Sequence, residues 1–309
     1  MTTTVAPSAR AKRRPGDLVF AGLAWGAGIV ILVALAGVAI FLTVEGAPAF
    51  HASSDAYFGA ANLVAYVWPL LFGTVLAATL ALLIATPLSL GVALVISHYA
   101  PRRLARPVGY AVDLLAAVPS VVYGLWGIGY LGRHLTPTYE WLEKHLGFLP
   151  FFAGPASATG KTILTAGIVL AIMAIPIITS ITREVFLQTP TLHEEAALAL
   201  GATRWEMIRM AVFPYARSGI VSAVMLGMGR ALGETMAVAM VLSASGIISF
   251  NLISSDNPST IAANIALQFP EATGLRVNAL IASGLVLFVL TFAVNFAARA
   301  IVARGARRS

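Results

Sequence analysis

The sequence contains no cysteine, and only 11% of its 309 residues are charged. The absence of cysteine excludes disulfides, thiolate metal sites and cysteine nucleophiles. Soluble globular domains carry roughly 25% charged residues, so a soluble chain with this little charge would expose large apolar patches to water. Together with 59% hydrophobic residues and a mean hydropathy of +0.86, the scarcity of charge predicts an integral membrane protein.

Histidine is also scarce, with five residues in the whole chain. They stand at His51, His98, His134, His145 and His193, and none of these positions has the close spacing of metal ligands. The sequence therefore predicts no metal site and no bound cofactor.

Long apolar runs are what the sequence has in abundance. A membrane-spanning helix needs about 20 mostly apolar residues, so these runs predict an all-α protein with six transmembrane helices. The predicted spans are Leu18–Val44, Pro69–Ile96, Pro107–Leu131, Thr162–Ile181, Ser218–Ala244 and Asn278–Ala303. We expect one transmembrane domain over residues 18–303, a basic tail over residues 1–17 and a short tail over residues 304–309. The first run is longer than the apolar part of a signal peptide, about 7–15 residues, so we expect it to be a retained helix.

The placement of lysine and arginine predicts the orientation of these spans. Of the 20 basic residues, 15 lie in the N-terminal tail, in the connection around Arg102–Arg106, in the long connection over residues 182–217, and at the C-terminal end from Arg299 onward. The other three connections, residues 45–68, 132–161 and 245–277, hold only four basic residues, and Arg230 lies within a span. Since basic residues favour cytoplasmic loops, both termini are predicted to be cytoplasmic in a cell membrane. The net charge of +7 then needs no nucleic-acid partner to explain it.

The segment from Gly154 to Thr162 is similar to a phosphate-binding P-loop, whose pattern is G-x-x-x-x-G-K-[ST]. However, five residues separate Gly154 from Gly160, and Pro155 stands where the first glycine should be. Lys161 also falls on the outer side of the membrane, where ATP is not available. We interpret the segment as a loop that caps the fourth span, and we expect that this chain does not bind ATP itself.

The connection over residues 182–217 predicts two short helices. Thr191 can cap the first, Glu194 and Glu195 stand near its positively charged N-terminus, and Gly201 can end it. The second is expected from Thr203 to about Val212. Taken alone, this pattern is typical of an amphipathic helix that lies on the membrane surface.

The same string resembles the EAA signature of ATP-binding-cassette importer permeases. The matching residues are Glu195, Ala196, Ala197, Gly201 and Pro214, whereas Ala211 and Phe213 replace the expected isoleucine and leucine. The resemblance implies a type I importer permease fold. It also implies that this loop is a coupling helix, which docks in a groove of a cytoplasmic ATPase subunit through Glu195 and turns at Gly201.

Other segments resemble the PstC-type permeases of phosphate importers. They are Gly16-Asp17, Thr86–Leu94, Tyr99–Pro101, Leu115–Gly127, Thr179–Glu184 and Arg230–Val238. This resemblance implies a non-catalytic subunit that works with a second permease, two cytoplasmic ATP-binding subunits and an extracytoplasmic phosphate-binding protein. The paired phosphate permease, and permeases for sulfate, molybdate or tungstate, share looser versions of these strings and stay as alternatives. A proton-coupled secondary transporter is an alternative of another class, in which the EAA-like loop has no role.

Arg230 and Glu234 are charged residues inside the fifth predicted span. A charge at that depth costs roughly 2.5–3.5 kcal/mol, and the i, i+4 spacing predicts that the two side chains pair on one helix face. They could form a structural ion pair that lets the helix insert, or they could line an oxyanion path, which is what the resemblance implies. Asp113 lies about two turns into the third span, and we expect a structural or gating role for it.

Overall fold

The computed structural model describes residues 15–306 of the chain and, within that range, is almost entirely helical. The basic tail predicted over residues 1–17 and the end of the C-terminal tail fall largely outside this range. Five helices are long and apolar enough to cross a membrane, or six if a bent pair is counted as one span. The long helices are α1 (Pro15–Gly46), α2 (Leu63–Leu94), α6 (Ile163–Leu187), α9 (Phe213–Gly233) and α12 (Leu275–Ala306).

The core of the bundle is α6, which packs between α2 and α9. Small side chains let these helices approach closely, which is how membrane helices gain van der Waals contact. The buried alanines at these contacts include Ala77, Ala81 and Ala85 of α2 and Ala166 and Ala174 of α6. Gly227 of α9 faces Ile178 of α6 so closely that a Cβ atom would lie 2.7 Å from the isoleucine side chain.

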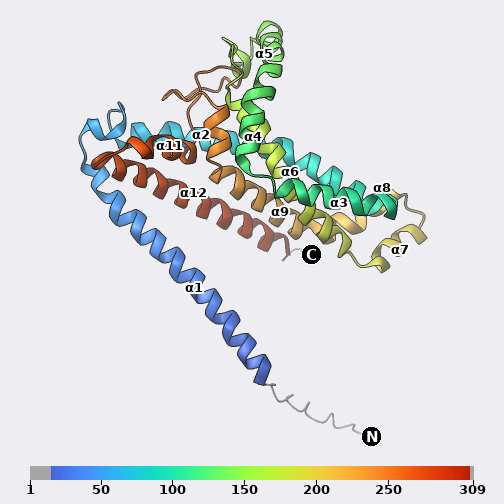
Figure 1. The fold of residues 1–309 in the computed structure, drawn as a ribbon. Helices are drawn as coiled ribbons and strands as arrows, with labels where there is room; N and C mark the ends of the chain where they lie inside the picture. Colours follow the sequence, from blue (N-terminus) through green and yellow to red (C-terminus); the bar gives the residue numbers. More distant parts are fainter. Residues whose placement is uncertain (1–14, 307–309) are drawn as a thin grey trace.

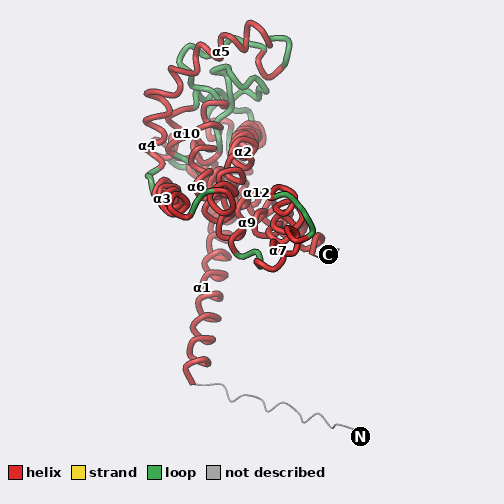
Figure 2. Tube along the Cα trace, turned by 90° about the vertical axis from the view of Figure 1, so that its right-hand side faces the viewer, coloured by secondary structure: helices red, strands yellow, loops and turns green. Residues whose placement is uncertain are grey.

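Helix α1 diverges from the rest of the bundle (Figures 1 and 2). Residues 16–38 are exposed throughout, although almost all of them are apolar. Only the last turns of α1 contact the bundle, where Gly46 packs against Ala282 of α12 and the Asn278 side-chain amide donates a 2.6 Å hydrogen bond to the Glu45 carbonyl. A helix that is apolar on all sides must be covered by lipid or by another subunit.

The third predicted span, Pro107–Leu131, is not one straight helix but a pair of helices that make the sixth candidate span when they are counted together. Helix α3 (Arg102–Ala116) and the helix that starts at Ser120 meet at an angle of 90°. Pro119 explains the break, because it lacks an N–H and disfavours the helical conformation of the residue before it. After α4 (Ser120–Trp126) the chain continues through a π-turn into α5 (Gly132–Leu146), which protrudes from the bundle in Figures 1 and 2.

The fifth predicted span, Ser218–Ala244, is interrupted as well. Helix α9 begins earlier than predicted, at Phe213, and ends at Gly233. A short helix, α10 (Met236–Val241), follows after two non-helical residues. The apolar run had predicted a continuous helix because it extends past the break without a change in composition.

After α10 the chain forms a loop that leads to α11 (Ile261–Gln268), and most of its second part, residues 251–260, is buried. Asn257 holds this loop in place and is fully buried. Its side-chain oxygen accepts a 3.0 Å hydrogen bond from the Ile163 N–H, and its side-chain amide donates a 2.6 Å bond to the Asn251 carbonyl. These bonds satisfy backbone groups that cannot reach water, which a loop packed into a bundle requires.

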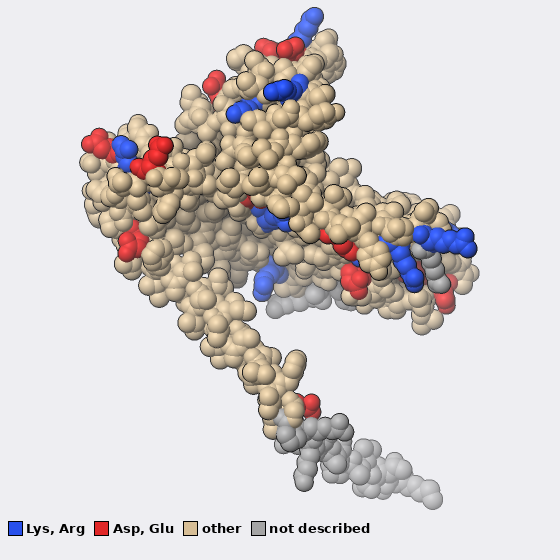
Figure 3. Space-filling model, in the orientation of Figure 1, with Lys and Arg blue, Asp and Glu red and all other residues tan. Residues whose placement is uncertain are grey.

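Charged side chains gather mainly at the ends of the bundle and on the protruding α5 region, as Figure 3 shows, and most of the surface between them is uncharged. This distribution fits a bundle that crosses a membrane, since charged groups are costly in its apolar interior. The segment that is similar to a P-loop lies in the outer loop before α6. There Thr162 caps α6 by accepting a 3.1 Å hydrogen bond from the Thr165 N–H, which confirms its interpretation as a helix cap.

Candidate functional site

Arg230 lies in the last turn of α9, close to the point where that helix ends. Its side chain is partly buried, and its Nε atom is buried without a hydrogen-bond partner within residues 15–306. An unsatisfied buried donor is costly, so this side chain is poised for a ligand that accepts hydrogen bonds. A guanidinium can bind the oxygens of an oxyanion through two parallel hydrogen bonds.

Glu234 does not pair with Arg230, and the predicted ion pair on one helix face was wrong. Because α9 ends at Gly233, Glu234 has an extended backbone (φ −70°, ψ 127°) and no longer follows helical spacing. Its Oε1 instead accepts a 3.1 Å hydrogen bond from the Ala237 N–H. Glu234 therefore caps α10, and the positive charge of Arg230 is not neutralised by it.

Two interrupted helices meet near this charge. The half-span α4 packs against α10, with Gly124 facing Ala237 and Met240. In transporters, interrupted helices at the centre of the membrane commonly form substrate sites, because free backbone groups and helix ends lie there. The sequence suggested Arg230 as a candidate and Pro119 as a break in the third span, but it did not indicate that the fifth span is broken at Gly233.

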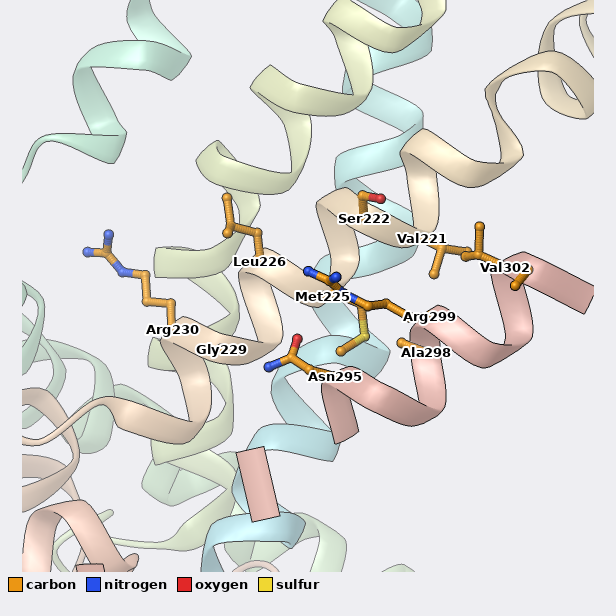
Figure 4. A pocket seen from close by; sticks show the side chains of 11 residues that line it. Val221, Ser222, Met225, Leu226, Gly229, Arg230, Asn295, Ala298, Arg299 and Val302 are labelled. Atoms are coloured by element: carbon orange, nitrogen blue, oxygen red, sulfur yellow. The ribbon is translucent and has the colours of Figure 1, made fainter. Parts of the chain in front are cut away.

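A groove with a volume of 560 Å³ lies between α9 and α12. Figure 4 shows that the guanidinium of Arg230 points away from the other lining side chains, whereas Arg299 lies among them. Ser222 and Asn295 are the other polar side chains of the groove. Sequence reasoning had counted Arg299 only with the cytoplasmic tail. The i, i+4 spacing of Asn295 and Arg299 on α12 was the available signal that they share a face.

Asp113 forms an ion pair with Arg183, at 3.5 Å between Oδ2 and Nη2. The pair joins α3 to the end of α6. Gly109 leaves the space for the guanidinium, because a Cβ atom at this position would lie 2.1 Å from Nη1 of Arg183. Asp113 therefore connects the first half of the broken third span to the core helix of the bundle.

The predicted coupling loop forms α7 (Thr191–Ala199) and α8 (Arg204–Met207), the latter continuing through a π-turn into α9. Gly201 turns the chain between them with a φ of +86°, the left-handed conformation that favours glycine. Thr191 does not cap α7, as had been predicted: the cap position is Pro190, and no side chain caps the helix.

Thr203 caps α8 in a reciprocal arrangement with Glu206, which lies in the same cytoplasmic connection. The Thr203 hydroxyl accepts a bond from the Glu206 N–H, and the Glu206 carboxylate accepts 2.8 Å bonds from the Thr203 N–H and hydroxyl. The bond from the Thr203 N–H, followed by that from its hydroxyl, lowers the pKa of Glu206 below its ordinary value. This capping box fixes the start of α8 just after the turn at Gly201.

The residues that match the EAA signature lie on one connected loop at the end of the bundle, separate from Arg230. Glu195, Ala196, Gly201 and Pro214 are exposed, and Ala197 is partly buried. Exposed leucines flank them: Leu192 is 73% exposed and Leu200 is 90% exposed. The opposite side of the loop is anchored, since Ile208 and Val212 are buried in a cluster with Phe186. A surface that combines apolar side chains and a carboxylate on a fixed base is suited to contact with another protein.

Comparison with known proteins agrees with these features. Residues 85–307 match the family model described as "Binding-protein-dependent transport system inner membrane component". The chain is 47% identical to "Phosphate transport system permease protein PstC 2" of Mycobacterium tuberculosis (strain ATCC 25618 / H37Rv), over 96% of this chain and 94% of that protein. It is 42% identical to "Phosphate transport system permease protein PstC" of Xylella fastidiosa (strain 9a5c), over 94% of this chain and 92% of that protein.

A solved structure shares the fold. A chain of the MetNI methionine ABC transporter, in an inward-facing conformation, matches 77% of this chain and 94% of its own length, with a TM-score of 0.50 and 20% sequence identity. The family match covers more than two thirds of the sequence, including the interrupted helices and the cytoplasmic loop. The chain therefore belongs to the family of binding-protein-dependent transport system inner membrane components, the permease subunits of ABC importers.

Proposed function

We propose that this chain is the PstC-type permease subunit of an ATP-driven importer for inorganic phosphate. The observation that carries the proposal is Arg230, a partly buried cation at a helix break, with no acidic partner among the described residues and a buried, unsatisfied Nε. Relatives that are 41–47% identical over most of the chain carry the name of phosphate transport permeases. A guanidinium in this setting is suited to a tetrahedral oxyanion.

The cation and the nearby carboxylate have different roles in this proposal. Arg230 attracts phosphate into the membrane and replaces part of its hydration shell with hydrogen bonds. Glu234 lies just beyond the break and contributes negative potential, which limits how tightly the anion is held. Weak binding favours transport, because a transported ion must leave the site as well as enter it.

The remaining parts of the importer are other proteins. A second permease completes the translocation path with this chain, and two cytoplasmic ATP-binding subunits dock on the coupling loop through Glu195 and the exposed leucines. An extracytoplasmic phosphate-binding protein docks on the outer connections, residues 45–68, 132–161 and 245–277. ATP hydrolysis occurs on the partner subunits, so this chain is non-catalytic.

The test is ATP-driven uptake by the complex reconstituted in liposomes, with Arg230→Gln compared with the native chain. We expect phosphate uptake to fall at least about 100-fold, as expected when a buried charged contact worth about 3 kcal/mol is lost. Arg106→Gln is the matched control, because it removes the same charge from an exposed position on α3. Competition by sulfate, molybdate and tungstate in the same assay identifies the oxyanion. Normal phosphate uptake by Arg230→Gln, in a complex that is fully assembled, contradicts the proposal.

A further inference from the structure

The cytoplasmic end of α2 contacts the coupling helix through one pair of side chains. Helix α2 continues into a π-turn, Val95–Tyr99, and Nε2 of His98 in this turn lies 3.5 Å from Oε1 of Glu194 in α7. Only 9% of the His98 side chain and 23% of the Glu194 side chain are exposed. Among the side chains that the structure describes there is one other ion pair, Asp113–Arg183, and it does not involve the coupling loop.

Both nitrogens of the His98 ring have a polar neighbour. Nδ1 lies 2.7 Å from the Ser97 hydroxyl, which also donates a 2.8 Å hydrogen bond to the Ala93 carbonyl. Nε2 faces the carboxylate of Glu194. The ring is therefore held by polar contacts on both sides, one within the end of α2 and one to α7.

The ring of His98 also packs on the core of the bundle. It lies edge-on to Phe186 at the end of α6, with the ring centroids 6.2 Å apart. Phe186 is fully buried and contacts Phe213 at the start of α9, and Phe213 in turn contacts Trp205 of α8. This aromatic row joins the ends of three membrane helices to the second helix of the loop.

The first helix of the loop has few other attachments. No residue of α7 is buried, and its neighbours in the chain are the exposed Leu200 and the turn at Gly201. A cavity of 280 Å³ lies beside the pair, and Tyr99 and Arg204 line it together with His98 and Glu194. Ala197 of α7 packs on the cluster that contains Ala93 and Leu94 of α2, and the His98–Glu194 pair adds a polar contact between the two helices.

We propose that His98 is a positioning residue that transmits movement of the coupling helix α7 to membrane helix α2, through its ion pair with Glu194. The inference rests on the proposed function, since it assigns a role within ATP-driven import. Movement imposed on α7 by the ATPase subunits is passed to α2, the helix that packs most extensively on the core helix α6. Without the pair, α7 and α2 are coupled only by the apolar contact of Ala197 with the cluster that contains Ala93 and Leu94.

The first test measures the contact itself and does not depend on the substrate. In the full complex, a spin label is attached through Ala199→Cys, an exposed position at the end of α7 in a chain that has no native cysteine. We expect His98→Gln to increase the mobility of this label and His98→Lys, which can pair with the Glu194 carboxylate, to leave it unchanged. Equal mobility in all three proteins overturns the proposal.

The second test measures phosphate transported per ATP hydrolysed in liposomes. We expect His98→Gln and Glu194→Gln each to lower this ratio roughly fivefold or more, and the exchanged pair, His98→Glu with Glu194→Lys, to restore most of it. Asp113→Asn is the matched control, because it removes the other ion pair without touching α7. A purely structural role predicts equal losses of uptake and hydrolysis, an unchanged ratio and no rescue by the exchanged pair.

The two tests separate the two proposals. If the native complex transports a different oxyanion, the phosphate assignment fails, while the label mobility and the ratio measured with that anion still decide the role of His98. If the native complex transports phosphate and the His98 variants show native mobility and ratio, the positioning role fails alone.

Discussion

Glu234 accepts a hydrogen bond from the N–H of Ala237, the residue three positions ahead, instead of pairing with Arg230 four positions behind. The end of α9 at Gly233 produces this arrangement, because it takes Glu234 off the helix face that Arg230 occupies. The Glu234 carboxylate thus has a hydrogen-bond partner in α10, and the Arg230 guanidinium is not paired with it. The two charges can be tested separately for this reason.

Two substitutions at Glu234 separate the effect of its hydrogen bond to α10 from the effect of its negative charge. Glu234→Gln keeps an oxygen that can accept from Ala237, so we expect the stability of the purified complex to change little. Glu234→Ala removes the cap and should destabilise the protein by about 1 kcal/mol. Thermal unfolding in detergent measures both.

In uptake assays, Glu234→Gln should lower the KM for phosphate and slow the turnover, because Arg230 then holds the anion more tightly. An unchanged KM contradicts this role for the charge.

Substitution of Gly201 tests the turn between the two helices of the coupling loop. Gly201→Val introduces a β-branched residue at a φ of +86°, where it is strained by about 1–2 kcal/mol. No other atom lies within 4 Å of the added Cβ, so the strain is confined to the backbone. We expect normal membrane insertion but loss of the ATPase stimulation that phosphate-loaded binding protein produces. Gly201→Asn is the control, since asparagine tolerates this conformation, and it should retain most of the stimulation.

Two glycines of α2 are expected to respond in opposite ways to alanine. At Gly73 a Cβ atom would lie 2.4 Å from the carbonyl oxygen of Ser259, in the loop before α11. Gly73→Ala should therefore lower the Tm of the protein by several degrees, since a buried clash typically costs about 1–3 kcal/mol. Gly91 has open space around it, and Gly91→Ala should leave the Tm unchanged or raise it slightly. A similar response at both positions contradicts the packing of this loop on α2.

Labelling of single cysteines tests the orientation of the bundle. Thr159 is exposed in the connection before α6, and His193 is exposed on α7. In intact cells we expect an impermeant thiol reagent to label Thr159→Cys and to label His193→Cys only after the membrane is opened. The native chain provides the blank, because it has no cysteine. Labelling of His193→Cys in sealed cells reverses the orientation derived from the basic residues.

The sequence predicts the long helices well, because α2, α6 and α12 each contain an uninterrupted apolar run of spanning length. It predicts the breaks poorly. Apolar residues continue beyond both Pro119 and Gly233, so the apolar run does not end where the helix stops. Pro119 was the visible signal for the first break, whereas no proline marks the second.

The candidate sites differ in the same way. The sequence predicted that the chain turns at Gly201, because a glycine directly after a short helix is a local signature of a helix end. The contact between His98 and Glu194 depends on how α2 and α7 meet, and nothing local to either residue predicts it. Arg299 was counted with the C-terminal tail, although its spacing from Asn295 on α12 was a local signal; the side of the groove that α9 forms has no such signal near Arg299 in the sequence.

Helix α1 meets the bundle only in its final turns, near Gly46 and Ala282. Residues 16–38 are exposed along their whole length, so packing within the described part of this chain does not set the angle between α1 and the bundle. That angle depends on the lipid or the other subunit that covers the apolar surface of α1.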